Sequence, residues 1–141
     1  LKKDGYILIG LYNKIGRLRT KIRKNIYKIF GKKLIMLLDP VLRKTEKNSK
    51  YKIEAWIRDQ YTHPVESVHT FDEVLRWFDQ NNIKFINSIP ESSIFSTSDK
   101  GYFENNNKGV YVERLLQQFF MIFNKFGSEG GLFIFIGKKN K

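Results

Sequence analysis

Two histidines stand close together in a polar run over residues 58–69. His63 and His69 suit proton transfer, because an imidazole ordinarily takes up or releases a proton near neutral pH. Glu66 and Asp59 are carboxylates that could accept a proton themselves or orient a histidine. The run therefore predicts general acid–base chemistry, with His63 and His69 as the candidate bases.

Other side chains suit the binding of a substrate. Arg58 carries a guanidinium that could hold a carboxylate or a phosphate. Tyr12 and Tyr61 could orient an aromatic or polar group, and Asn13 follows Tyr12 directly. The alternative for these residues is that they pack, or hydrogen bond within their own loop. The candidate substrate-binding residues are Tyr12, Asn13, Arg58, Asp59, Tyr61 and Glu66.

The same run invites a comparison with metal sites. His63, Glu66 and His69 follow one another at intervals of three residues. Two zinc-binding histidines on one helix need a spacing of four, and Pro64 disrupts a regular helix here. We therefore expect no metal in this run.

The sequence after the polar run strongly predicts a helix. This helix would position the end of the polar run. Thr70 and Glu73 form a capping-box pattern, in which each side chain accepts a hydrogen bond from the other residue's backbone N–H. Val74, Leu75 and Phe78 then recur at helical spacing. The pattern predicts a helix over residues 71–81, and a loop over residues 58–69 before it.

Three apolar runs predict strands, at residues 6–11, 83–89 and 132–137. The first is nearly continuous, which is typical of a strand buried on both faces. Helical spacing predicts an aromatic-rich helix over 110–126, after a surface loop over 91–108. Strands separated by helices predict an α/β sheet, in which the first two strands are parallel.

The positive charge is concentrated in one segment. The chain of 141 residues has a formal charge of +12. Residues 1–52 contain 16 Lys and Arg against 3 Asp and Glu, whereas residues 53–141 contain 10 against 11. Residues 15–30 predict a basic amphipathic helix that ends near Gly31. Such a helix could meet an anionic partner, either nucleic acid or a membrane surface, or it could be a lid with a solvated basic face.

The amino-acid composition bears on the cellular location of the protein and on whether it spans a membrane. The chain contains no cysteine, which excludes disulfides and thiolate metal sites and favours an intracellular, cytoplasmic location. No apolar run approaches the ~20 residues that a membrane-spanning helix needs. We therefore expect no transmembrane segment.

Several of these segments resemble parts of one protein family. Leu1-Lys-Lys-Asp-Gly-Tyr-Ile-Leu-Ile-Gly10 resembles the turn and fifth strand of class I S-adenosylmethionine-dependent methyltransferases, although Lys-Asp stands where that pattern has Pro-Gly. Residues 71–89 are similar to the last helix and sixth strand of that family, and residues 130–137 to its antiparallel final strand. The run Asp59-Gln-Tyr-x-His-Pro resembles a bacterial subgroup with a helical insertion after the fifth strand.

The resemblance implies the C-terminal part of a doubly wound, Rossmann-like methyltransferase sheet. It implies three strands, the last antiparallel, with residues 1–13 and 70–141 as the core and residues 14–69 as a helical lid. It also implies S-adenosylmethionine as cofactor and a methyl acceptor that these residues do not identify. The sequence contains no Gly-x-Gly-x-Gly and no matching acidic residue, so the cofactor loop would come from an N-terminal part of the same domain. This chain alone is expected to be inactive.

Overall fold

The computed structural model describes residues 1–45, 49–62, 66–95, 101–123, 125–126 and 129–140. The chain forms two compact units. Unit 1 consists of Leu1–Arg17 with Ser67–Lys141, and unit 2 consists of Leu18–Glu66. The predicted base His63 lies outside the described residues.

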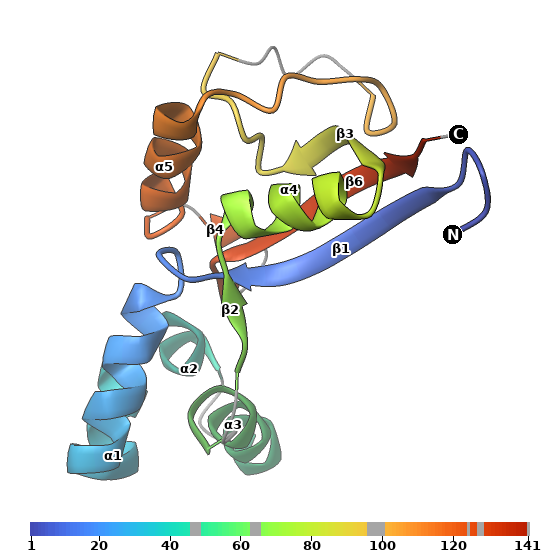
Figure 1. Ribbon diagram of the computed structural model, residues 1–141. Coiled ribbons are helices and arrows are strands. Elements are labelled where there is room, and N and C mark those ends of the chain that lie inside the picture. The colour runs from blue at the N-terminus through green and yellow to red at the C-terminus, as the bar shows by residue number, and fades with distance from the viewer. Residues whose placement is uncertain (46–48, 63–65, 96–100, 124, 127–128, 141) are drawn as a thin grey trace. The chain divides into compact units, whose positions relative to one another are not determined.

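Unit 1 is built on a mixed sheet (Figure 1). Within the described residues the sheet has four strands in the order β2–β1–β6–β3. The bounds are Tyr6–Asn13 for β1, Val68–His69 for β2, Ile83–Ile89 for β3 and Leu132–Lys139 for β6. β1 and β2 are parallel, whereas β6 runs antiparallel to both β1 and β3. A two-stranded ribbon, β4 (Lys125–Phe126) and β5 (Glu129–Gly130), precedes β6.

The predicted α/β class is confirmed, and the predicted number of three strands is wrong. The additional strand in the sheet is β2, which has two residues and lies in the polar run. A strand this short shows no alternation of apolar and polar side chains, so its sequence carries no strand signal. β6 lies between β1 and β3, which are therefore parallel to each other.

Helix α4 (Phe71–Gln80) covers one face of this sheet (Figure 1). The N–H of Glu73 donates to Thr70 Oγ1 over 3.2 Å, and the N–H of Thr70 donates to Glu73 Oε2 over 2.8 Å. The predicted helix and its capping box are thus confirmed. Asn81 caps the carboxyl end, and Asn82 has a positive φ of 53°.

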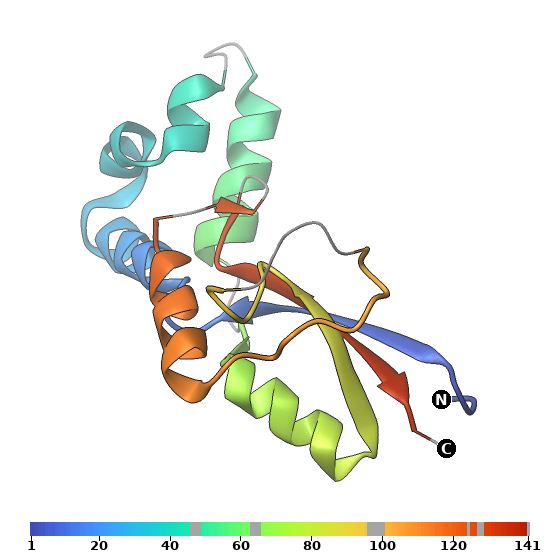
Figure 2. The same ribbon diagram turned by 90° about the horizontal axis from the view of Figure 1, so that it is seen from above.

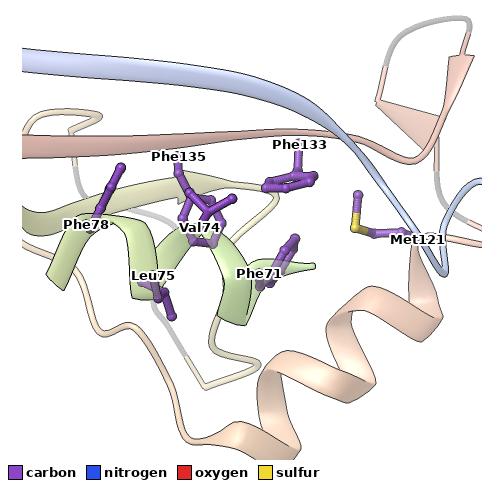
Figure 3. Packing of buried hydrophobic residues seen from close by; sticks show 7 residues of the cluster. All are labelled: Phe71, Val74, Leu75, Phe78, Met121, Phe133 and Phe135. Atoms are coloured by element: carbon purple, nitrogen blue, oxygen red, sulfur yellow. The ribbon is translucent and has the colours of Figure 1, made fainter. Parts of the chain in front are cut away.

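The core of unit 1 lies between α4 and the sheet. Figure 3 shows Phe133 and Phe135 of β6 directed toward α4, where Phe71 meets both rings at centroid distances of 5.0 and 5.1 Å. The buried members of this cluster are Phe71, Val74, Leu75, Phe78, Met121, Phe133 and Phe135. Aromatic contacts of this kind add to the free energy gained by burying apolar surface.

The face of β1 away from α4 is more open than its sequence predicts. Ile7, Ile9 and Leu11 pack on the core, whereas Tyr6 and Leu8 alternate to the opposite face and are exposed. The prediction that this strand is buried on both faces is therefore wrong for the described structure. Strand geometry sends successive side chains to opposite faces, and α4 covers only one of them.

Helix α5 (Tyr111–Phe120) ends at Phe120 rather than at Phe126. The N–H groups of Ile122 and Phe123 bond to carbonyls three residues back, so the chain tightens into a turn that leads to β4. Apolar side chains continue at helical spacing through this turn, which explains the longer prediction. Exposed apolar side chains on α5 and its turn include Val112, Leu115, Leu116, Phe119, Phe120 and Phe123.

Unit 2 is helical in its described residues. It contains α1 (Leu18–Leu38), α2 (Pro40–Lys44), α3 (Lys50–Ile57) and a π-helical turn, η1 (Arg58–Thr62). Gly31 interrupts α1 with φ 71° and ψ −164°, near the predicted end of the basic helix. The core of this unit is formed by Ile35, Leu42, Ile53, Ile57 and Tyr61.

The polar run begins as helix rather than as the predicted loop. Ile53, Ile57 and Tyr61 follow one another at a spacing of four residues, and all three are buried in the core of unit 2. This shared face continues the helical path of α3 through Arg58–Thr62. Burial of the Tyr61 ring outweighs the polar character of its neighbours in setting the local structure.

Candidate functional site

The candidate site of unit 1 lies where β1 ends. Because β1 and β3 are parallel, their carboxyl ends lie at the same edge of the sheet, the edge at which open α/β sheets bind ligands. Tyr12 and Asn13 end β1 and pair with Val68 and His69 of β2. The structure thus brings three predicted site residues together: Tyr12, Asn13 and His69.

Asn13 is fully buried and holds the turn after β1. Its Oδ1 accepts hydrogen bonds from the N–H groups of Ile15 and Gly16, each over 2.9 Å. Its Nδ2 donates to Gln118 Oε1 over 2.8 Å and to the carbonyl of His69 over 3.3 Å. These four bonds use the full hydrogen-bonding capacity of the amide. Asn13 therefore holds the turn at the end of β1, and its contact with a substrate stays a prediction.

Gln118 links this turn to the start of α4. Its Oε1 also accepts from the N–H of Phe71, one of the first amides of α4, which have no partner within the helix. Its Nε2 donates to the carbonyl of Arg114. Arg114 in turn pairs with Asp72 of α4. One buried network therefore joins the end of β1, the start of α4 and helix α5.

Two glycines allow the turn after β1 to approach the turn before β6. A Cβ on Gly16 would lie 2.8 Å from the Cα of Gly131, and Gly131 has a positive φ of 85°. The N–H of Asn13 donates to the carbonyl of Gly131 over 2.6 Å. This close approach brings Arg17 over Tyr12, with the guanidinium carbon 4.1 Å from the ring centroid. Arg17 is buried, and the pair is a cation–π contact that packs the end of β1 against the turn after it.

His69 is the one predicted base within the described residues. Its Nδ1 lies 3.5 Å from Glu73 Oε2, and its ring meets the edge of Trp77 at a centroid distance of 5.0 Å. Its side chain keeps 25% of its surface exposed. A histidine that faces a carboxylate and remains reachable from solvent has the arrangement that a general base requires.

The other predicted site residues belong to unit 2. Arg58 is exposed and Asp59 accepts a hydrogen bond from Gln60 Nε2. Glu66 forms an ion pair with Lys24 over 3.2 Å. Tyr61 is buried, and its hydroxyl donates to Asp39 Oδ2. The Tyr61 hydroxyl thus anchors a buried carboxylate, and the role of Tyr61 in substrate binding stays a prediction.

Asp39 is the centre of a buried polar cluster in unit 2. Burial alone would raise the pKa of its carboxyl group. Hydrogen bonds from Tyr61, Trp56 and the N–H of Val41, together with the charge of Arg23, outweigh burial and hold this pKa below its usual range. The Nε1 of Trp56 donates over 3.0 Å, and an Arg23 nitrogen lies 3.7 Å away. Asp39 stays ionised because its donors replace the water that burial removes.

Sequence reasoning missed several residues that organise these sites. Arg17 and Gln118 owe their roles to partners distant in the chain, which no local spacing indicates. Asp39 likewise depends on donors that are distant in the chain, Trp56 and Tyr61. Glu73 fits the capping-box pattern, whereas its second contact, with His69, depends on the path of the chain from β2 into α4.

Among the described residues, no group of three or more His, Cys, Asp and Glu side chains is arranged to hold a metal ion. No helix in the described part of the chain is both long enough and apolar enough to cross a membrane.

Comparisons with protein-family models, curated proteins and solved structures find no match to this chain.

Proposed function

We propose that this chain is the C-terminal part of a class I S-adenosylmethionine-dependent methyltransferase domain. In this proposal unit 1 supplies the substrate side of the methyl-transfer cleft and unit 2 is the inserted lid. The observation that carries the proposal is the direction of β6. The resemblance implies an antiparallel final strand, and β6 is antiparallel to both of its neighbours while β1 and β3 are parallel.

The outer edge of β1 is consistent with the proposal, because it could pair with a further strand from another part of the domain. Among the described residues, only Val68 and His69 pair with that edge, opposite Tyr12 and Asn13. The rest of the edge is an apolar stretch with no charge or proline, the features by which proteins protect an exposed strand. The opposite edge differs, because β3 carries Lys84 and a bulge between Phe85 and Asn87. A further parallel strand on β1 would cover the unprotected edge.

The residues of unit 1 suggest separate roles in methyl transfer. Transfer from a sulfonium requires an oxygen or nitrogen nucleophile, often freed of its proton by a base. His69 is our candidate for that base, and Glu73 orients its imidazole through Nδ1. Tyr12 is only partly buried at the end of β1, beside His69 of β2, where its ring could orient an acceptor with an aromatic or polar group.

The described residues do not by themselves build a site for the cofactor. The sequence contains no Gly-x-Gly-x-Gly turn through which a dinucleotide-like ligand approaches a helix N-terminus. The proposal therefore assigns the cofactor loop to another part of the domain. S-adenosylmethionine would supply the methyl group, and we assign no residue of this chain to its binding.

The alternative is a non-enzymatic basic module that binds nucleic acid or a membrane surface. The concentration of positive charge in unit 2 favours it, with 13 Lys and Arg against 5 Asp and Glu in residues 18–66. It predicts binding to an anionic partner that weakens steeply with salt, without any effect of S-adenosylmethionine.

The role of His69 is tested in a polypeptide that contains this chain and the proposed cofactor loop. We expect His69→Ala to lower methyl-transfer turnover by about 100-fold, the usual contribution of a positioned base, while the affinity for S-adenosylmethionine stays unchanged. Turnover is measured as the release of S-adenosylhomocysteine with a panel of acceptors. The affinity for S-adenosylmethionine is measured by calorimetry. His69→Gln is the matched variant, since it keeps a polar side chain but cannot act as a base. Unchanged turnover in both variants would exclude His69 from catalysis.

A further inference from the structure

The break in α1 leaves two large apolar side chains in solvent. Ile29 and Phe30 directly precede Gly31 and are 73% and 63% exposed. Gly31 has a backbone conformation that only glycine adopts readily, and the helix changes direction there (Figure 2). The residues of α1 that pack on the core of unit 2 are Ile26, Tyr27, Ile35 and Met36. Ile29 and Phe30 therefore do not take part in the core.

Cations surround this apolar pair. Lys28 precedes it, Lys32 and Lys33 follow it after the break, and all three lysines are exposed. We call residues 28–33 the α1 ridge. Its charge is part of a larger excess, since residues 18–66 contain 13 Lys and Arg against 5 Asp and Glu. The ridge thus combines apolar side chains, whose burial is favourable, with cations that are attracted to a negatively charged surface.

A shallow groove of about 290 Å³ lies elsewhere on the same unit. Its apolar lining comes from Ile22, Ile26 and Leu38, and Arg19 and Arg23 complete it. Arg23 also faces the buried carboxylate of Asp39. This groove lies at the lower limit of the volumes that hold drug-sized ligands. It suits a single flexible apolar segment, such as part of an acyl chain, with an anionic group beside the guanidinium groups.

We propose that unit 2 docks on the surface of an anionic phospholipid bilayer. Ile29 and Phe30 enter the boundary between headgroups and acyl chains, and the three lysines of the ridge contact the phosphates. The protein lies on the membrane in this arrangement, because the apolar residues of the ridge reach only a short way into the bilayer.

Charge and side-chain type favour a bilayer over other partners. A nucleic acid binds through cations and stacked aromatic rings, and it offers no place for exposed aliphatic side chains such as Ile22, Ile29 and Leu37. The centres of protein–protein interfaces are poor in lysine. A second copy of this chain would bring two strongly positive surfaces together, which their repulsion opposes. An anionic bilayer satisfies both the apolar and the cationic side chains.

The test is sedimentation of the full chain with vesicles. One set contains phosphatidylcholine alone, and the other an equal mixture of phosphatidylcholine and phosphatidylglycerol. We expect binding to the anionic set only, and weaker binding as salt increases. The double variant Ile29→Ser, Phe30→Ser is expected to bind at least about tenfold more weakly, from the lost burial of apolar surface. Each of Lys28→Gln, Lys32→Gln and Lys33→Gln is expected to weaken binding about fivefold.

Phe119→Ser is the matched control. Phe119 is an exposed aromatic residue of α5 in unit 1, 50% exposed, and we expect its replacement to leave vesicle binding unchanged. Circular dichroism of each variant verifies that the helices remain folded. The proposal is overturned if neutral vesicles bind equally well, if the Ile29 and Phe30 double variant binds normally, or if Phe119→Ser weakens binding as much. Binding to single-stranded RNA but not to vesicles would also overturn it.

Discussion

The side-chain amide of Asn13 donates a hydrogen bond to Gln118 Oε1 over 2.8 Å, and both side chains are buried. Gln118 Oε1 also accepts from the N–H of Phe71 over 3.1 Å. A single acceptor in α5 therefore fixes the end of β1 and the start of α4. The geometry around His69 depends on this bond, because His69 lies between these two points and its carbonyl accepts from Asn13.

Gln118→Ala should lower the free energy of unfolding of unit 1 by about 2–6 kcal/mol. The variant leaves the amide of Asn13 and the N–H of Phe71 buried without their acceptor, at about 1–3 kcal/mol for each group. Urea unfolding followed by Trp77 fluorescence in a Trp56→Phe background measures the loss. Gln117→Ala is the control on the same helix, with an expected change within about 0.5 kcal/mol. Equal effects of the two variants would show that the network does not stabilise unit 1.

Gly137→Ala should lower the free energy of unfolding by about 1–3 kcal/mol through overpacking. A Cβ at this position would overlap Ile83 Cγ2 and lie 2.7 Å from Phe78 Cε2, and Phe78 has no room to move in the buried core. Gly10→Ala is the matched control in β1, since its Cβ would meet only Ile134 Cγ1 at an ordinary 3.9 Å. We expect that control to be neutral or slightly stabilising. A destabilised Gly10→Ala together with an unaffected Gly137→Ala would contradict the packing of α4 on β6.

The stability of unit 2 should depend on the ionisation of Asp39. The pKa of this carboxyl group is lower in the folded protein than its ordinary value of 3.8. Its contribution is therefore complete above the unfolded pKa and is lost as pH falls through the folded pKa. Unfolding followed by Trp56 fluorescence in a Trp77→Phe background should show stability falling with pH below about 4.

Asp39→Asn provides the corresponding test by mutation. The variant should lose about 2–4 kcal/mol at neutral pH, because an amide has a single acceptor oxygen. If that oxygen keeps the bonds from Tyr61 and Trp56, the NH2 group replaces the oxygen that accepts from the N–H of Val41, and the negative charge that faces Arg23 is lost. Its acid-dependent loss of stability should also be smaller than in the unaltered protein. Asp59→Asn, an exposed carboxylate in the same unit, is the control and should change neither property. An unchanged pH profile in Asp39→Asn would contradict the assignment.

The sequence predicts elements whose signals are local. The capping box of Thr70 and Glu73 fixes the start of α4, and Gly31 marks the break in α1. The parallel direction of β1 and β3 could be predicted, because a helical connection between two strands favours a parallel pair. The roles of Asn13 and Tyr61 could not, since each depends on a partner remote in sequence, Gln118 and Asp39 respectively.

The polar run shows why an apparent cluster of site residues can be divided by the fold. Arg58 and Tyr61 continue a helix of unit 2, where Tyr61 is buried, whereas His69 pairs with β1 in unit 1. Because these residues are close together in the sequence, the sequence predicts a single loop over residues 58–69 with a single function. The periodicity of Ile53, Ile57 and Tyr61 indicates a helical face, which becomes clear only when the core of unit 2 is known.

The most direct test of the methyltransferase proposal is the binding of S-adenosylmethionine, measured by calorimetry on the longest natural polypeptide that contains residues 1–141. The proposal predicts saturable binding with one site per polypeptide, and little or no binding by residues 1–141 alone. A folded polypeptide that gives no heat of binding would contradict the proposal, as would a natural reading frame without a glycine-rich strand–turn–helix before Leu1.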